Sequence, residues 1–210
     1  MKIGILGSGN VGQVLAKGFK SIGHDVIIGS REGNKLAAFS AESGIKEAAF
    51  NDVVAGADVI VLALKGDGAE AIVKGLAEAL AGKLVLDATN PISGEAKDGI
   101  VPYFTAANDS LIQRLQQLAP KAKIVKCFNS VGAHLMVKPA LKGGTPAMFI
   151  CGDDADAKTT TARLLDQLGW HAEDVGTSTA GHAVEALCQL WCAPGFLKND
   201  WAHAFAVLRP

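Results

Sequence analysis

The stretch GSGNVG at residues 7–12 has the spacing GxGxxG and decides the fold of this 210-residue chain. It directly follows a short apolar run, residues 2–6, and opens a segment, residues 11–23, whose apolar positions recur at helical spacing. A strand, a glycine turn and a helix in this order are typical of a dinucleotide-binding fold. A glycine-rich structural turn is the alternative interpretation of the same six residues.

The glycines of this turn have separate expected roles. Gly7 permits the tight turn, Gly9 lets the backbone approach a pyrophosphate, and Gly12 lets the helix pack closely on the strand. The helix N-terminus then offers free N–H groups and a dipole that favour an anion. The residues expected to line the pyrophosphate site are Gly7, Ser8, Gly9, Asn10, Val11 and Gly12.

Strand-like and helix-like segments alternate along the rest of the chain. Strands are predicted at residues 25–28, 57–64, 84–86, 123–128, 147–151 and 170–175, with a weak one near Ile45, and helices at 36–43, 69–80, 111–118 and 155–168. This alternation predicts an α/β fold with a Rossmann-type, doubly wound, mainly parallel sheet. We expect a dinucleotide-binding domain at 1–135 and a C-terminal α/β extension at 136–210 packed on it, or one continuous domain.

Composition limits the partners. The chain is 49% hydrophobic but only 6% aromatic, and its formal net charge is -1 without a long basic run, so neither nucleic acid nor an anionic membrane is indicated. A small molecule is the expected partner. The four cysteines lie in apolar stretches and are interpreted as core residues rather than as disulfides or metal ligands. With no signal-like leader at the N-terminus, we expect a cytoplasmic protein and no metal.

The end of the second predicted strand indicates the cofactor. NAD-specific enzymes place an Asp or Glu there to hold the ribose hydroxyls. This chain has Ser30 and Arg31 instead, while Asp25 lies at the other end of the strand and Glu32 one residue too far along. Together with Lys35, these residues can bind a 2′-phosphate, which favours NADP(H). Solvated surface charges are the alternative.

The C-terminal part contains apolar surface. Residues 180–192 form a predicted helix that is apolar nearly all round, and the tail at 196–208 holds three of the eleven Phe and Trp residues. A homodimer contact or a lid over the site would use this tail. Packing of the tail onto its own domain is equally compatible with the sequence.

Several motifs together resemble one family. GSGNVG and the GSR of residues 29–31 are followed by LVLDATNPI at 84–92, KCFNSVGAHLM at 126–136, CGDDADAK at 151–158 and GHAVEALCQLW at 181–191. In this order, and over essentially the whole chain, they resemble the NADPH-dependent deazaflavin (coenzyme F420) reductases. The same fold unit forms the NADPH domain of membrane ferric reductases. The resemblance implies hydride transfer between NADP(H) and a deazaflavin, or a flavin such as FMN or FAD.

The resemblance also implies further site residues. Leu64 would lie beside the nicotinamide ribose, and the positions implied near the two rings are Asn90, Pro91, Asn129, Ser130, Val131, Gly132 and Ala133. The family usually has a proline after the strand that ends near Leu64, where this chain has KGDG at 65–68. We therefore expect a more flexible, more charged loop, with Lys65 directed at a phosphate or into solvent.

A catalytic acid is not required for direct hydride transfer, which depends on distance, alignment and exclusion of water. His134 is a weak candidate proton donor, and His182 a weaker one, if the acceptor were a ketone or imine. Two other functions remain open: reduction of a small imine or ketone, and NADP(H) sensing without catalysis. Enzymes of the former kind carry a larger helical second domain than the final 30 or so residues could form.

Overall fold

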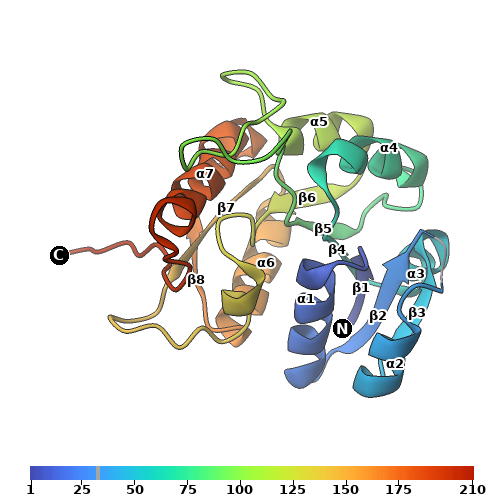
Figure 1. Ribbon diagram of the computed structural model, residues 1–210. Helices are drawn as coiled ribbons and strands as arrows, with labels where there is room; N and C mark the ends of the chain where they lie inside the picture. The colour runs from blue at the N-terminus through green and yellow to red at the C-terminus, as the bar shows by residue number, and fades with distance from the viewer. Residues whose placement is uncertain (32–33) are drawn as a thin grey trace.

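A single eight-stranded sheet forms the centre of the protein in the computed structural model, which describes residues 1–31 and 34–210 (Figure 1). The strands are β1 (Lys2–Leu6), β2 (Asp25–Ser30), β3 (Lys46–Ala49), β4 (Val59–Leu62), β5 (Leu84–Asp87), β6 (Lys123–Lys126), β7 (Ala147–Gly152) and β8 (His171–Asp174). The α-helices are α1 (Asn10–Ser21), α2 (Ala37–Ser43), α3 (Phe50–Gly56), α4 (Gly66–Leu76), α5 (Leu111–Leu118), α6 (Ala155–Gln167) and α7 (Gly181–Lys198). Two short 3-10 helices are η1 (Ala133–Leu135) and η2 (Ser178–Ala180).

The strand order is β3-β2-β1-β4-β5-β6-β7-β8, and every pair is parallel except β6 with β7. The predicted doubly wound, mainly parallel sheet is confirmed. β7 runs against β6, with Val125 opposite Gly152, so no crossover helix is needed between these two strands. Residues 136–210 thereby extend the same sheet rather than forming a separate one.

Two apolar cores cover the two faces of the sheet. On one face, Leu15 and Phe19 of α1 and Leu165 of α6 pack against inward side chains of the strands. On the other face, Val73 of α4 and Leu115 of α5 do the same, together with residues of α3. The central strands β1, β4 and β5 are buried on both sides, which explains why their sequences are continuous apolar runs rather than alternating patterns.

The KGDG segment differs from the loop expected there. Lys65 is the N-cap of α4, and Gly66, Asp67 and Gly68 form its first turn. Gly66 is required by packing, because a Cβ at this position would lie 2.0 Å from the carbonyl oxygen of Asn90. Asp67 carries negative charge at the positive end of the helix dipole. The expectation of a flexible loop is therefore wrong, and the helix begins three residues earlier than predicted.

The C-terminal helix is longer than its sequence pattern suggested. α7 continues past Cys192 to Lys198, with Pro194 inside it, and the remaining tail has no helix. The tail first packs on its own chain: Trp191 Nε1 donates to the carbonyl of His203 at 2.8 Å, and the Ala147 amide donates to Phe205. Beyond this point Leu208 is exposed, whereas Arg209 pairs with Glu173 of β8 at 2.6 Å; Figure 1 marks the C-terminus. Of the helices in the described ranges, none is long and apolar enough to cross a membrane.

Candidate functional site

The loops after β1, β2, β4, β5 and β6 lie side by side along one edge of the sheet, because backbone hydrogen bonds continue past the strand ends. Each bond runs from a backbone amide after one strand to a carbonyl at the end of a neighbouring strand, over 2.9–3.1 Å. The pairs are Gly7 to Gly29, Ala63 to Leu6, Ala88 to Leu62 and Cys127 to Asp87. The chain winds in opposite directions on the two sides of the β1–β4 pair. This is the switch point at which open α/β sheets bind ligands.

The glycine turn has a packed side and an open side. Gly7 has a φ of +140°, and a Cβ there would lie 2.1 Å from Ala63 O, while a Cβ on Gly12 would lie 2.0 Å from Gly7 O. Gly9, the exposed N-cap of α1, has no described atom within 4 Å of its Cβ position. The turn therefore leaves open space at the helix N-terminus, which fits a bound pyrophosphate.

A carboxylate of β3 lies against the end of β2, where the sequence indicated none. Arg31 and Lys35 are exposed, whereas the buried Ser30 donates its hydroxyl to Glu47 Oε1 of β3 at 2.6 Å. Burial opposes ionisation of Glu47, but the hydrogen bonds from Ser30 and from two backbone amides outweigh it and lower the Glu47 pKa. Glu32 lies outside the described residues.

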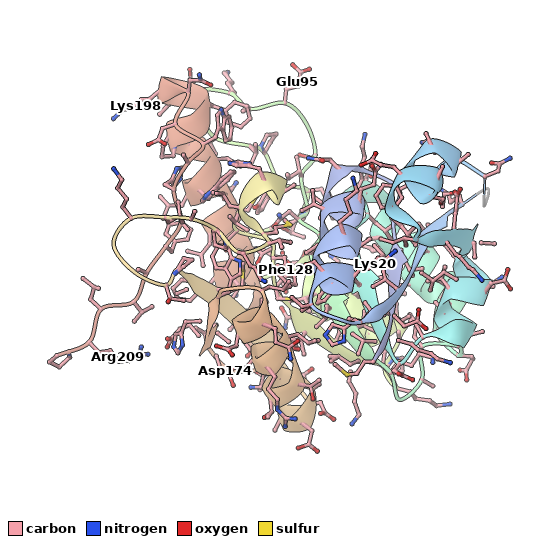
Figure 2. All side chains as sticks on the ribbon, turned by 90° about the horizontal axis from the view of Figure 1, so that it is seen from below. Lys20, Glu95, Phe128, Asp174, Lys198 and Arg209 are labelled. Carbon is pink, nitrogen blue, oxygen red and sulfur yellow. The ribbon has the colours of Figure 1, made fainter. Side chains whose placement is uncertain are left out.

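Two asparagines join the ends of β5 and β6. Asn90 Nδ2 donates to the backbone carbonyl of Asn129 at 2.8 Å, and Asn129 Nδ2 donates to Val184 O of α7 at 2.9 Å. Phe128, which precedes Asn129, has a φ of +61°, uncommon for a bulky residue, and lies inside the molecule between α1 and the rest of the fold (Figure 2). The structure therefore brings together two of the residues predicted to lie near the rings.

A buried charge cluster lies directly beneath this edge. Lys126 Nζ is 2.7 Å from Asp87 Oδ2 and 2.9 Å from Glu185 Oε1, and all three side chains are at most 1% exposed. Lys126 also donates to the carbonyl of Thr89, next to Asn90. Burial alone would lower the Lys126 pKa, but the two carboxylates together raise it above its ordinary value. In the sequence, the sign of this cluster is that each of these three charged residues lies inside an apolar stretch.

The remaining predicted residues follow β4, β5 or β6 along the chain, except for His182 on α7. Leu64 is half-buried, Lys65 is exposed, and Ser130 and Val131 are buried in the turn that leads to η1. His134 is exposed, and its Nε2 lies 2.9 Å from the carbonyl of Trp201 in the tail. His182 is exposed at the start of α7, with Nδ1 3.1 Å from Thr179 O.

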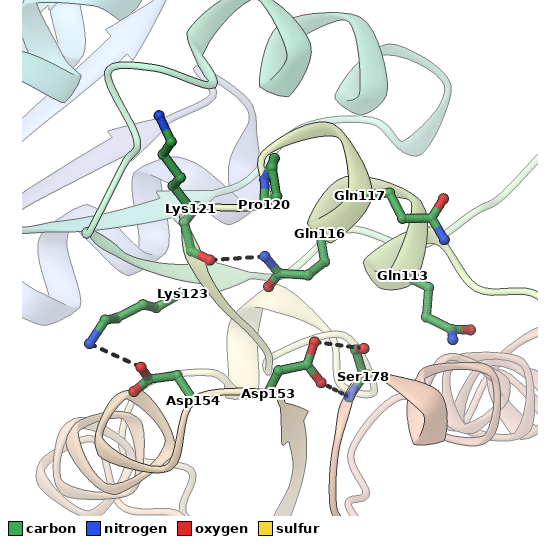
Figure 3. Close-up of a pocket in the computed structure, with 10 residues that line it drawn as sticks. Gln113, Gln116, Gln117, Pro120, Lys121, Lys123, Asp153, Asp154 and Ser178 are labelled. Atoms are coloured by element: carbon green, nitrogen blue, oxygen red, sulfur yellow. Dashed lines mark hydrogen bonds and ion pairs between the residues drawn. The ribbon is translucent and has the colours of Figure 1, made fainter.

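A polar pocket of about 580 Å³ lies near the amino end of β6, at the opposite edge of the sheet (Figure 3). Lys123 pairs with Asp154 at 3.0 Å in its lining, and Asp153 accepts hydrogen bonds from the amide and hydroxyl of Ser178. Because the glycine turn and the asparagine pair lie at the carboxyl edge, this pocket is separate from the candidate site.

All four cysteines are free thiols. Burial raises the Cys127 pKa well above its ordinary value and raises that of Cys151 to about 12. The Sγ atoms of Cys188 and Cys192 are 4.0 Å apart on α7, and Cys192 is the most exposed of the four. These positions agree with the interpretation of the cysteines as packing residues.

Thiol titration is expected to separate the two groups of cysteines. Because thiolate is the reactive form, Cys127 and Cys151 should resist an aromatic disulfide reagent in the native protein and react only after unfolding. The hydrogen bond between the α7 cysteines lowers the Cys188 pKa and raises that of Cys192, so substituting both by Ser should remove the fastest native reaction. Cys127→Ser should leave the native kinetics unchanged. Rapid native labelling of Cys127, located by peptide mass analysis, would contradict its burial.

The fold and the carboxyl-edge site define a dinucleotide-binding protein of the Rossmann type. The family described as NADP oxidoreductase, coenzyme F420-dependent, matches residues 2–91. A crystal structure from Arthrobacter sp. FB24, provisionally assigned as an F420-dependent NADP reductase, is 34% identical, with a TM-score of 0.92 and 100% coverage of both chains. The chain belongs to this family of NADP-dependent oxidoreductases.

Two curated relatives show how far the similarity extends. The F420-dependent NADP reductase of Methanocaldococcus jannaschii is 27% identical over 203 residues, covering 90% of each chain. The metalloreductase STEAP3 of Rattus norvegicus is 28% identical over 187 residues, covering 89% of this chain but 36% of that protein. The chain thus spans about a third of the length of this larger relative.

More distant structures share the fold alone. A pyrroline-5-carboxylate reductase from Coxiella burnetii aligns with a TM-score of 0.67 at 18% identity, covering 93% of this chain and 66% of that one. This similarity agrees with the doubly wound sheet and carries no argument about substrate.

Proposed function

We propose that this protein transfers a hydride between NADP(H) and a deazaflavin of the coenzyme F420 type, with FMN or FAD as the alternative acceptor. The observation that carries the proposal is the open turn at Gly9, which lies beside a second strand that ends in Ser30 and is followed by Arg31. Membership of an F420-dependent family supports the choice of acceptor.

In this proposal each part of the carboxyl edge has its own task. The amides at the start of α1 bind the pyrophosphate, and Arg31 and Lys35 bind the 2′-phosphate. Leu64, Asn90 and Asn129 contact the nicotinamide and the acceptor ring and hold the two rings face to face. A bound nicotinamide supplies the hydride, so the protein contributes alignment and exclusion of water rather than an acid. His134, already bonded to the tail, is not needed.

A panel of acceptors tests the proposal. The purified protein should oxidise NADPH when a deazaflavin is added. The rate of NADPH oxidation is then measured with FMN, FAD, a ferric chelate and a cyclic imine in turn. Turnover with the deazaflavin supports the proposal, and turnover with a flavin alone supports the alternative acceptor. Turnover with the imine alone would overturn it, as would tight NADPH binding without turnover, which would indicate a sensor.

Arg31→Ala is expected to weaken NADPH binding selectively. Hydrogen bonds to charged groups contribute roughly 1.5–3 kcal/mol each, which corresponds to about a ten- to hundredfold change in the dissociation constant. NADH lacks the 2′-phosphate, so its affinity should hardly change. Calorimetric titration of both cofactors measures the difference, and Arg163→Ala on α6 is a matched control. Equal losses for NADPH and NADH would show that Arg31 does not bind the 2′-phosphate.

We also propose that the protein is a cytoplasmic homodimer. Three large apolar side chains of α7 support this proposal, since Leu190, Phe196 and Leu197 are 59%, 51% and 62% exposed. The free thiols of the four cysteines are consistent with a reducing compartment. Sedimentation analysis should give twice the chain mass for the wild type, and Leu197→Glu should reduce it to a monomer. A monomeric wild type at micromolar concentration would exclude the dimer.

A further inference from the structure

We propose that Glu47 is a positioning residue for recognition of the 2′-phosphate, because it joins the two segments that carry Arg31 and Lys35. The proposal rests on the NADP(H) binding proposed above. Glu47 lies on β3, outside the glycine turn and the β2 end that define the cofactor site by sequence. Its carboxylate nevertheless contacts both segments, and we name these three hydrogen bonds the Glu47 clasp.

The clasp uses both carboxylate oxygens. Oε1 accepts the Ser30 hydroxyl at 2.6 Å and the Lys35 amide at 2.8 Å, and Oε2 accepts the Leu36 amide at 2.8 Å. Ser30 immediately precedes Arg31 at the end of β2, and Leu36 is the N-cap residue of α2. Ser30 and Leu36 are buried, so the clasp has two fixed anchoring points. It thereby fixes the backbone next to Arg31 and at Lys35, from which these two side chains extend.

The side chains of Arg31 and Lys35 are themselves exposed. Long exposed cations lose conformational freedom when they bind a phosphate, and that loss is smaller if their backbones are already fixed. Hydrogen bonds to an ionised carboxylate are stronger than neutral ones, and those made by Glu47 lower its pKa. A carboxylate therefore fixes this segment better than a neutral side chain of the same size.

The same carboxylate also repels the phosphate, because both are negatively charged. Glu47 thus has two opposite effects on NADPH binding, and two substitutions separate them. Glu47→Asp keeps the charge, but the side chain is one methylene shorter and cannot reach all three donors. Glu47→Gln removes the charge; its amide oxygen can still accept the two bonds now made to Oε1, but its NH2 group cannot accept the Leu36 amide.

The test is calorimetric titration of NADPH and NADH with the wild type and both variants. We expect Glu47→Asp to weaken NADPH binding by about tenfold, the order of the ordering cost of long side chains, with NADH changed by less than about twofold. Glu47→Gln should bind NADPH more tightly than Glu47→Asp, because it keeps acceptors for two of the three bonds and no longer repels the phosphate. Glu42→Asp on α2 is the matched control, because Glu42 is exposed and pairs with Lys17 alone among the described residues.

Each result is decisive. Unchanged NADPH affinity in Glu47→Asp, or equal losses for NADPH and NADH, would overturn the positioning role. Weaker NADPH binding in Glu47→Gln than in Glu47→Asp would do the same, because charge would then matter more than the clasp. A wild type that binds no NADPH would instead defeat the proposed function. Thermal denaturation of both variants checks that each is folded at the temperature of the titration.

Discussion

Lys126→Met is expected to lower the free energy of unfolding by about 3–5 kcal/mol, the usual cost of removing one partner from a buried ion pair. The substitution leaves Asp87 and Glu185 buried without their shared cation. Some of their other contacts remain, since Glu185 also accepts the amides of Leu111 and Ile112 at the start of α5. These neutral donors cannot replace a full positive charge, so the variant should unfold at a lower denaturant concentration.

The loss should depend on pH in a defined direction. Protonation of one of the two buried carboxylates removes the repulsion between them, so the native variant binds a proton that the unfolded chain does not. Its deficit relative to the wild type should therefore be smaller at about pH 5 than at about pH 8. Lys121→Met, at an exposed pair with Glu78, is the control and should stay within about 0.5 kcal/mol. A Lys126→Met variant as stable as the wild type at both pH values would contradict the buried pairing.

Gly9→Val is expected to abolish cofactor binding without destabilising the fold. The backbone of Gly9 has φ -77° and ψ -179°, which valine adopts readily, and no described atom lies near the Cβ position. The new side chain would fill the space where a pyrophosphate approaches the helix N-terminus. Loss of two charged hydrogen bonds corresponds to roughly 3 kcal/mol or more, so both NADPH and NADH should bind more than about 100-fold more weakly.

Fluorescence titration with each cofactor and thermal denaturation measure the two halves of this prediction. Gly75→Val in α4 is a suitable control, because its Cβ position is also free of described neighbours and lies on another helix. It should bind both cofactors as the wild type does. If Gly9→Val kept its affinity, the pyrophosphate would have to bind elsewhere, and the candidate site would be wrong.

The glycine turn and the strand pattern were predictable because they depend on local spacing. GSGNVG at 7–12 lies between a strand and a helix in the structure as in the sequence, and the main strands appear within a few residues of their predicted positions. Local periodicity does not give strand direction, so the antiparallel placement of β7 could not be foreseen. It also missed α3, which is only seven residues long.

The contacts that organise the site were harder to predict because they join distant parts of the chain. Lys126, Asp87 and Glu185 come from β6, β5 and α7, and nothing in their separate surroundings indicates that they meet. Glu47 lies on a short strand with little apolar character, and its contact with Ser30 depends on the pairing of β2 with β3. The tight approach of Gly66 to Asn90 likewise follows from tertiary packing.

The buried lysine also bears on whether this chain is modular. Glu185, one of its two counter-charges, belongs to the C-terminal helix, and the same helix accepts the Asn129 side chain through Val184 O. A fragment ending at residue 135 would keep the glycine turn but lose these partners from its interior. Recombination that exchanged the C-terminal segment would have to conserve an acid at this position. The two halves of the sheet are thus constrained to be inherited together.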